Sequence, residues 1–243
     1  MRAEPGELPS ETAEPLRPEQ RLAELLARAR RLEGDGEAAG ALELLAAAPA
    51  ELQRFGSYCY ARGALAFRLD RLDEAVRLFE QAVRYAPDIA EYQANLGAAL
   101  LERARRSEQR AGLMRALVVL EHACALRPRL PHAWVNLGLA LQLAGRHQEA
   151  IAAFDRALAM APEDASALYN RAASCHALGR EQECLQALEQ LLERAPGFAP
   201  ALRSRCATLA RLSRRAEAQQ ALARYLAACP GAADAEQLRQ LVG

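Results

Sequence analysis

Apolar residues recur with helical spacing along residues 131–162. In the first half of this segment, three of them stand at positions i, i+3 and i+7, which share one face of a helix: Trp134, Leu137 and Leu141. In the second half, a similar stripe comprises Ala150, Phe154 and Ala157. Gly145 lies between the stripes, where glycine accepts the positive φ of a helix end, and Pro162 cannot continue the second helix. The pattern predicts two helices, over 132–144 and 147–161, joined by a tight turn.

The same arrangement repeats along most of the chain. Five prolines mark the repeats and are separated by 41, 34, 34 and 34 residues: Pro87, Pro128, Pro162, Pro196 and Pro230. Eight residues before each proline lies a large apolar residue: Phe79, Leu120, Phe154, Leu188 or Leu222. Because one helical hairpin cannot bury enough surface to be stable alone, the repeats are predicted to stack on one another.

Small residues form two further columns of the repeat. One lies in the second helix of each unit: Ala75, Ala116, Ala150, Cys184 and Ala218. The other lies near the middle of the first helix: Gly63, Gly97, Gly138, Ala172 and Cys206. A small side chain lets two helix backbones approach closely. We therefore expect Phe154 to fill the space beside the small residues of its hairpin.

The composition favours helices over strands. Only ten residues are β-branched (six Val, two Ile and two Thr), whereas Ala, Leu, Glu, Arg and Gln are abundant. An all-α fold is therefore predicted. All 31 basic residues are Arg, so the chain has no Lys for Schiff-base chemistry or for a phosphate-binding P-loop.

A 34-residue helix–turn–helix unit of this kind resembles the tetratricopeptide repeat. The resemblance is carried by Trp134, Leu137, Gly138, Ala150, Phe154, Ala157 and Pro162. It implies an all-α, right-handed α-solenoid of stacked repeats. Five repeats are expected, the second with seven additional residues: 56–89, 90–130, 131–164, 165–198 and 199–232.

The two ends of the chain are expected to differ from these repeats. Residues 1–19 hold four Pro and five Glu and are expected to form a disordered arm. Residues 20–55 are expected to form a degenerate repeat whose second helix is short. Residues 233–243 are expected to form a capping helix with Leu238 and Leu241 facing inward.

The resemblance implies a binding surface on the concave face, which the first helices of the repeats form. At one position facing it, three consecutive repeats carry Asn95, Asn136 and Asn170. A side-chain amide offers a donor and an acceptor together, which matches the N–H and C=O of an extended peptide. The row of amides predicts a ladder that holds a peptide backbone, as in some peptide-binding members of the family. The alternative is that each amide only satisfies a local hydrogen bond.

Around these amides the expected groove is largely apolar. Val135, Leu139 and Tyr169 are expected to select ligand side chains, with His132 and Arg203 at the margins. The alternative is that some of these residues pack between helices. The Lys and Asn pair of the family's carboxylate clamp is missing at the corresponding positions, which argues against binding of chaperone tails.

Five arginines gather near the seven additional residues: Arg103, Arg105, Arg106, Arg110 and Arg115. The additional residues are expected to extend both helices of their repeat into a protruding hairpin. Two interpretations stay open for this Arg103–Arg115 hairpin, namely a solvated loop and a docking point for an acidic partner.

The sequence lacks the common signatures of enzymes. It contains no HExxH, no GxSxG, no Gly-rich nucleotide loop after a strand and no paired-cysteine zinc spacing. Cys175, Cys184 and Cys206 fall on interior positions, where they are either packed thiols or, with His176, a metal or redox site. No enzymatic activity, cofactor or metal is expected.

Charge and hydropathy limit the classes of partner that the protein is expected to bind. The 31 basic and 31 acidic residues cancel, so no overall field attracts nucleic acid or anionic lipid. The first residues contain no apolar signal segment, and no run is long enough to span a bilayer. We therefore expect a cytoplasmic location and no membrane insertion.

The expected function is that of a non-catalytic adaptor or scaffold, which binds a protein or peptide segment in the concave groove. Two alternatives remain. One is a structural or assembly subunit, which an exposed apolar patch on the convex face would favour. The other is an accessory subunit that presents substrate to a separately encoded enzyme.

Overall fold

The computed structural model describes residues 16–107 and 110–243, with the side chain of residue 110 also left undescribed. Within these residues the chain forms thirteen α-helices and one short 3-10 helix, and no strand. The arm expected over 1–19 falls mostly outside the described residues. Its last two residues belong to the first helix, which begins at Pro18 because proline fits the first position of a helix.

Twelve of the helices form six antiparallel hairpins in chain order. They are α1 (Pro18–Gly34) with α2 (Ala38–Ala46), α3 (Gly56–Arg68) with α4 (Leu72–Tyr85), α5 (Ala90–Ser107) with α6 (Arg110–Leu126), α7 (Pro131–Leu143) with α8 (His147–Leu158), α9 (Ala165–Ala177) with α10 (Glu181–Arg194), and α11 (Ala199–Arg211) with α12 (Arg215–Ala228). The 3-10 helix Leu52–Arg54 follows α2, and α13 (Ala235–Val242) ends the chain.

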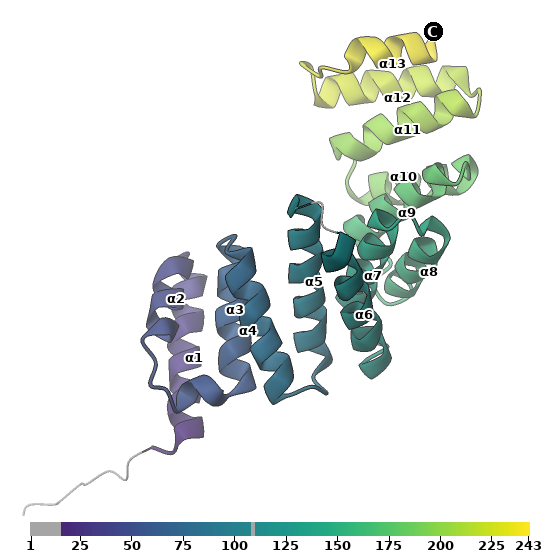
Figure 1. Cartoon of the computed structure of the whole chain (residues 1–243). Coiled ribbons are helices and arrows are strands. Elements are labelled where there is room, and N and C mark those ends of the chain that lie inside the picture. Colours follow the sequence, from purple (N-terminus) through teal and green to yellow (C-terminus); the bar gives the residue numbers. More distant parts are fainter. Residues whose placement is uncertain (1–15, 108–109) are drawn as a thin grey trace, which may run out of the picture.

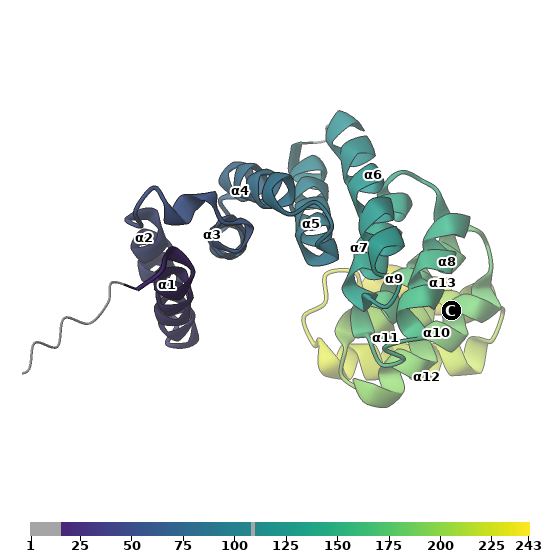
Figure 2. The same ribbon diagram turned by 90° about the horizontal axis from the view of Figure 1, so that it is seen from below.

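The hairpins stack side by side in one curved row, from α1 and α2 to α13 (Figure 1). Seen from below, the row turns as it proceeds, so that α9 to α13 do not continue the line of α1 to α4 (Figure 2). The expected all-α solenoid is confirmed. The additional residues lengthen both helices of one hairpin, since α5 has 18 residues and α6 has 17, whereas α7 has 13.

The turns inside the hairpins require a positive φ. Gly145 and Gly179 adopt φ values of 77° and 72° at corresponding turns, as expected for glycine. In two other hairpins the same turn is made by Asp70 and Ser213, with φ values of 63° and 56°. The turn geometry is therefore a property of the repeat, which glycine favours but does not strictly require.

The core runs between the two helices of each hairpin and between neighbouring hairpins. Phe79 and Phe154, in equivalent second helices, are 1% and 0% exposed. At the C-terminal end, Leu238 and Val242 of α13 are buried, whereas Leu241 is 51% exposed. The expectation that Leu241 faces inward is wrong, because the face of α13 that meets α11 and α12 is the one shared by residues i and i+4.

Candidate binding groove

The first helices of neighbouring hairpins form the inner side of the row. Contacts join α3 with α5, α5 with α7, and α7 with α9. Among the described residues, no pair of consecutive second helices is joined to a comparable extent. A stack whose first helices approach more closely than its second helices curves toward the first helices. The concave face is therefore lined by α3, α5, α7 and α9, and α11 continues it through a pocket that it lines together with α9.

The three asparagines lie on these first helices, but two of their amides are engaged locally. Asn95 Nδ2 donates to the Glu91 carbonyl oxygen at 2.8 Å and to Tyr60 Oη at 3.3 Å. Asn170 Nδ2 donates to the Ser166 carbonyl oxygen, also at 2.8 Å. Each amide thus bonds the carbonyl four residues earlier in its own helix, which leaves its side-chain carbonyl oxygen for other partners.

Asn136 stands between them on α7 and is half-buried. Within the described residues, its amide does not form the local bond seen at Asn95 and Asn170. Of the three, Asn136 therefore offers the most complete set of donors and acceptors to a ligand.

The apolar residues expected around the amides divide into two groups. Leu139 and Tyr169 are partly buried and keep exposed surface, and His132 is exposed. Val135 is 7% exposed and belongs to the central core. Its expected role in selecting ligand side chains is corrected, because α7 contacts both α5 and α9 and little of Val135 is left for a ligand.

Two aromatic pairs lie at the groove helices, and the repeat pattern does not predict them. The rings of Tyr60 and Tyr92 stack with centroids 4.8 Å apart, and Tyr169 meets Phe198 edge to face at 5.8 Å. Burial raises the pKa of the Tyr60 hydroxyl, which therefore remains a neutral hydrogen-bonding group. The sequence does place Tyr60 and Tyr169 at equivalent positions of two repeats. Their partner rings come from other elements, so the repeat pattern alone does not predict the pairs.

A cavity of about 180 Å³ is lined by residues of α9, α10 and α11. Its lining includes Tyr169 and His176 from α9, Cys184 from α10, and Arg203 and Thr208 from α11. Two of the expected groove residues, Tyr169 and Arg203, therefore meet at one cavity. Its walls are mostly apolar with a few polar groups, as is typical of ligand sites.

Arg203 is tied to the end of the chain. Its Nε donates to a carboxylate oxygen of Asp234, which also accepts a hydrogen bond from Tyr225 Oη at 2.9 Å. The hydrogen bond with Arg203 holds the pKa of Asp234 below its ordinary value of 3.8. Arg203 can reach a ligand carboxylate only in competition with Asp234.

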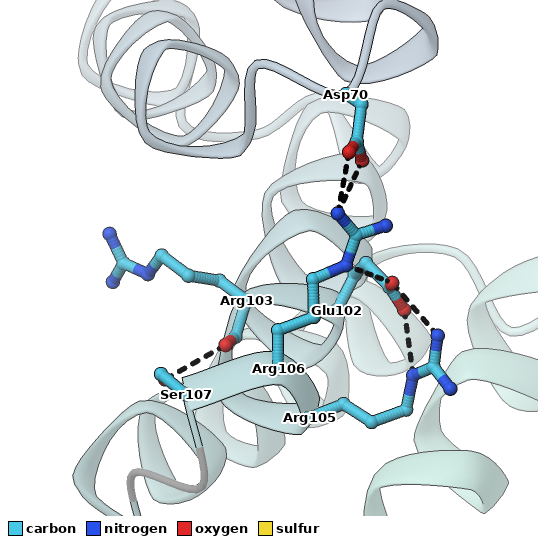
Figure 3. A network of polar contacts seen from close by, with 6 residues as sticks. All are labelled: Asp70, Glu102, Arg103, Arg105, Arg106 and Ser107. Carbon is cyan, nitrogen blue, oxygen red and sulfur yellow. Dashed lines mark hydrogen bonds and ion pairs between the residues drawn. The ribbon is translucent and has the colours of Figure 1, made fainter.

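Carboxylates of the chain itself pair with the described arginines of the Arg103–Arg115 hairpin, and Figure 3 shows the pairs of Arg105 and Arg106. Arg105 and Arg106 both bond Glu102, and Arg106 also reaches Asp70 at 2.6 Å. Arg103 and Arg115 pair with Asp73 and Glu80 at 3.3 and 2.7 Å. These pairs leave little unpaired positive charge on the four arginines whose side chains are described, and an acidic partner at this hairpin stays a prediction.

None of the described helices combines the length and the apolar character that crossing a membrane requires. In the part of the chain that the structure describes, one group of side chains could hold a metal ion, namely His176, Glu181 and Cys184. All six cysteines are free, and five of them are buried.

Fold and groove together define a helical-hairpin solenoid with a concave face. Three models of the tetratricopeptide repeat match the sequence, over residues 56–89, 131–164 and 165–198. The chain is therefore a tetratricopeptide-repeat protein, as the spacing of the prolines and small residues indicates. No curated protein matches the chain significantly.

Solved structures share the fold at low sequence identity. PilW, titled a widely conserved type IV pilus biogenesis factor, is 20% identical with a TM-score of 0.78, over 90% of this chain and 99% of its own. MamA is 21% identical with a TM-score of 0.63, over 71% and 91%. YrrB, titled a TPR protein with an unusual peptide-binding site, is 20% identical with a TM-score of 0.61, over 78% and 97%.

Proposed function

We propose that this protein is a non-catalytic adaptor that binds an extended peptide segment of a partner along its concave face. Tetratricopeptide repeats form protein–protein interaction scaffolds, which is the general role that the fold implies. The observation that carries the finer proposal is the row of Asn95, Asn136 and Asn170 on consecutive groove helices, with Asn136 free of the local helix bond. We further propose that it acts in the cytoplasm.

The groove suits a peptide backbone flanked by apolar side chains. Asn136 offers both a donor and an acceptor, and each of Asn95 and Asn170 still offers a side-chain carbonyl oxygen to a peptide N–H. Leu139 and Tyr169 supply apolar surface beside them. Because the helices are fixed by stacking, the ordering cost of binding falls on the ligand.

Capture of partners from the native lysate, read by mass spectrometry, tests this proposal. Replacing Asn136 and Asn170 together with Ala should weaken binding of a captured peptide about tenfold, or about 1.4 kcal/mol. The matched control replaces Gln186 and Gln190, two exposed amides on second helix α10, with Ala. If the wild-type protein, the asparagine variant and the control bound the peptide equally, the asparagines would not be the residues that hold its backbone.

A second candidate, an assembly subunit, is favoured by an apolar stripe on the outer side of the row. Met114 and Val118 stand one turn apart on second helix α6 and are 55% and 63% exposed. Leu143, the last residue of the groove helix α7, lines the same surface pocket as Met114 and is 48% exposed, so the apolar surface extends from α6 to the end of α7. Exposed apolar clusters mark interaction surfaces. Light scattering that shows a stable dimer, converted to a monomer by Val118→Glu, would favour this candidate over the groove.

A further inference from the structure

Three potential metal ligands meet where α9 turns into α10. His176 lies in the last turn of α9, Glu181 begins α10, and Cys184 follows one turn later. Their ligand atoms lie within 4.8 Å of one another. Neighbouring ligand atoms of a tetrahedral zinc ion are roughly 3.4–3.6 Å apart, given bond lengths near 2.0–2.3 Å. Modest rotations of the side chains therefore bring all three onto one ion.

Cys175 and Cys206 do not take part in this group. Both thiols are buried, like that of Cys184, although their positions in the repeat predict that the three lie together. Across the described residues, His176, Glu181 and Cys184 form the one cluster of three potential ligands at this spacing. Cys175 and Cys206 therefore serve as matched buried cysteines against which Cys184 can be compared.

The Glu181 carboxylate is buried and incompletely satisfied. Its side chain is 10% exposed, and Oε2 lies 3.0 Å from His176 Nδ1. Arg211 Nε lies 2.6 Å from Oε1 as an ion pair, but the contact is not aligned as a hydrogen bond, so Oε1 is buried without one. Arg211 therefore compensates the charge at Oε1 but makes no aligned hydrogen bond there, and Oε2 is the oxygen that faces His176.

Neighbouring groups orient these ligands as the surroundings of a metal site do. Thr208 Oγ1 lies 3.3 Å from Cys184 Sγ and can donate to a thiolate, and Arg211 pairs with Oε1 of Glu181, the oxygen that does not contact His176. Such outer contacts hold metal ligands in place and tune their basicity. Burial raises the pKa of the Cys184 thiol, and the bond with Thr208 acts in the opposite direction.

The site has room for a fourth ligand. His176 and Cys184 both line the cavity of about 180 Å³ at α9, α10 and α11. The His176 side chain is 43% exposed, which gives an ion a path from solvent. Three protein ligands and one open position are typical of zinc ions that keep a bound water.

We infer that His176, Glu181 and Cys184 bind a zinc-class divalent cation whose fourth coordination position opens into the groove cavity. The mixed nitrogen, oxygen and sulfur ligands select a borderline-soft ion such as Zn²⁺ over Mg²⁺ or Ca²⁺, which prefer oxygen alone. This site departs from the expectation, based on sequence alone, that the chain binds no metal. It does not depend on the peptide groove being occupied.

Titration of the reduced, chelator-stripped full-length protein with Co²⁺ and then Zn²⁺ tests the inference. Co²⁺ should bind with one-to-one stoichiometry and give a thiolate-to-cobalt absorption band that Zn²⁺ abolishes. The band should vanish in Cys184→Ser and persist in Cys175→Ser and Cys206→Ser. Zn²⁺ should raise the melting temperature of the wild-type protein.

If Cys184→Ser does not fold, substitution of His176, the half-exposed ligand, tests the inference instead. His176→Ala should weaken Zn²⁺ binding at least tenfold, whereas His132→Ala, which removes an exposed groove histidine outside the cluster, should change it less than twofold. Three results would overturn the inference: no stoichiometric binding, a cobalt band that persists in Cys184→Ser, or equal Zn²⁺ affinity of His176→Ala and the wild type. The three side chains would then serve packing alone.

Discussion

Phe154 occupies the space that the missing side chain of Gly138 leaves, so closely that a Cβ atom at residue 138 would lie 2.5 Å from Phe154 Cε1. Gly63 and Phe79 show the same relationship in an earlier hairpin, where the corresponding distance is 2.8 Å. Real Cβ atoms do not approach other atoms this closely. Glycine in the first helix is therefore what permits a buried phenylalanine in the second.

Gly138→Ala should destabilise the protein by about 1–3 kcal/mol, because Phe154 or the backbone of α7 must move to admit the methyl group. Urea unfolding followed by circular dichroism measures this change. The effect runs against helix propensity, which by itself would favour alanine.

Gly40→Ala is the matched control for this prediction. Gly40 lies in helix α2, and a Cβ atom there would meet its nearest neighbour, Glu37 Oε2, at 3.6 Å, an ordinary contact. This substitution should stabilise the protein by about 0.5–1 kcal/mol through lower backbone entropy of the unfolded chain. If both variants were stabilised, the contact with Phe154 would not be the reason for glycine at position 138.

Tyr58→Phe should loosen the N-terminal hairpin from the rest of the solenoid. Tyr58 is 1% exposed, and its hydroxyl donates to the Leu45 carbonyl oxygen at 2.6 Å, near the end of α2. Loss of this hydrogen bond should cost about 1 kcal/mol. Hydrogen exchange should show faster opening of α1 and α2 with little change in α9 to α12; uniform protection along the chain would contradict the prediction.

Arg203→Ala should lower the melting temperature at neutral pH and lose this effect in acid. Arg203 holds the pKa of Asp234 below 3.8 in the folded protein. A depressed carboxylate pKa stabilises the fold above the ordinary pKa, and the contribution disappears as the pH falls through the folded value. The control, Arg194→Ala, removes a partner of Glu163 in a pair about 70% exposed on both sides. Thermal unfolding measures both variants across the pH range. The difference in melting temperature from wild type should stay the same at every pH for Arg194→Ala, whereas it should shrink in acid for Arg203→Ala.

Asn136→Ala and Asn170→Ala should leave folding stability unchanged or raise it by up to about 0.7 kcal/mol, since alanine is the better helix former. The Asn170 amide bonds only its own helix and its neighbour Ser166. Thermal unfolding of each single variant checks this. A large loss of stability would mean that the asparagines serve the fold, and weaker partner capture by the double variant would then say nothing about the groove.

Much of the groove could not be foreseen from position in the repeat. Val135 stands at a groove position yet is buried, because helices from the repeats on either side approach it. Arg203 was expected at the groove margin, and its pairing with Asp234, 31 residues later, depends on how α13 docks. The His176–Glu181–Cys184 cluster did leave a signal, a histidine ending one helix and an acid and a thiol three residues apart in the next.

The sequence by itself determined the helical hairpins and their stacking, because the apolar period, the small residues and the prolines recur within each unit of about 34 residues, and the contacts they specify are local. Only the tertiary structure decided which groove side chains remain available to a ligand. That depends on packing between repeats and on ion pairs such as Arg203 with Asp234, which bring together residues whose spacing in the chain follows no common rule.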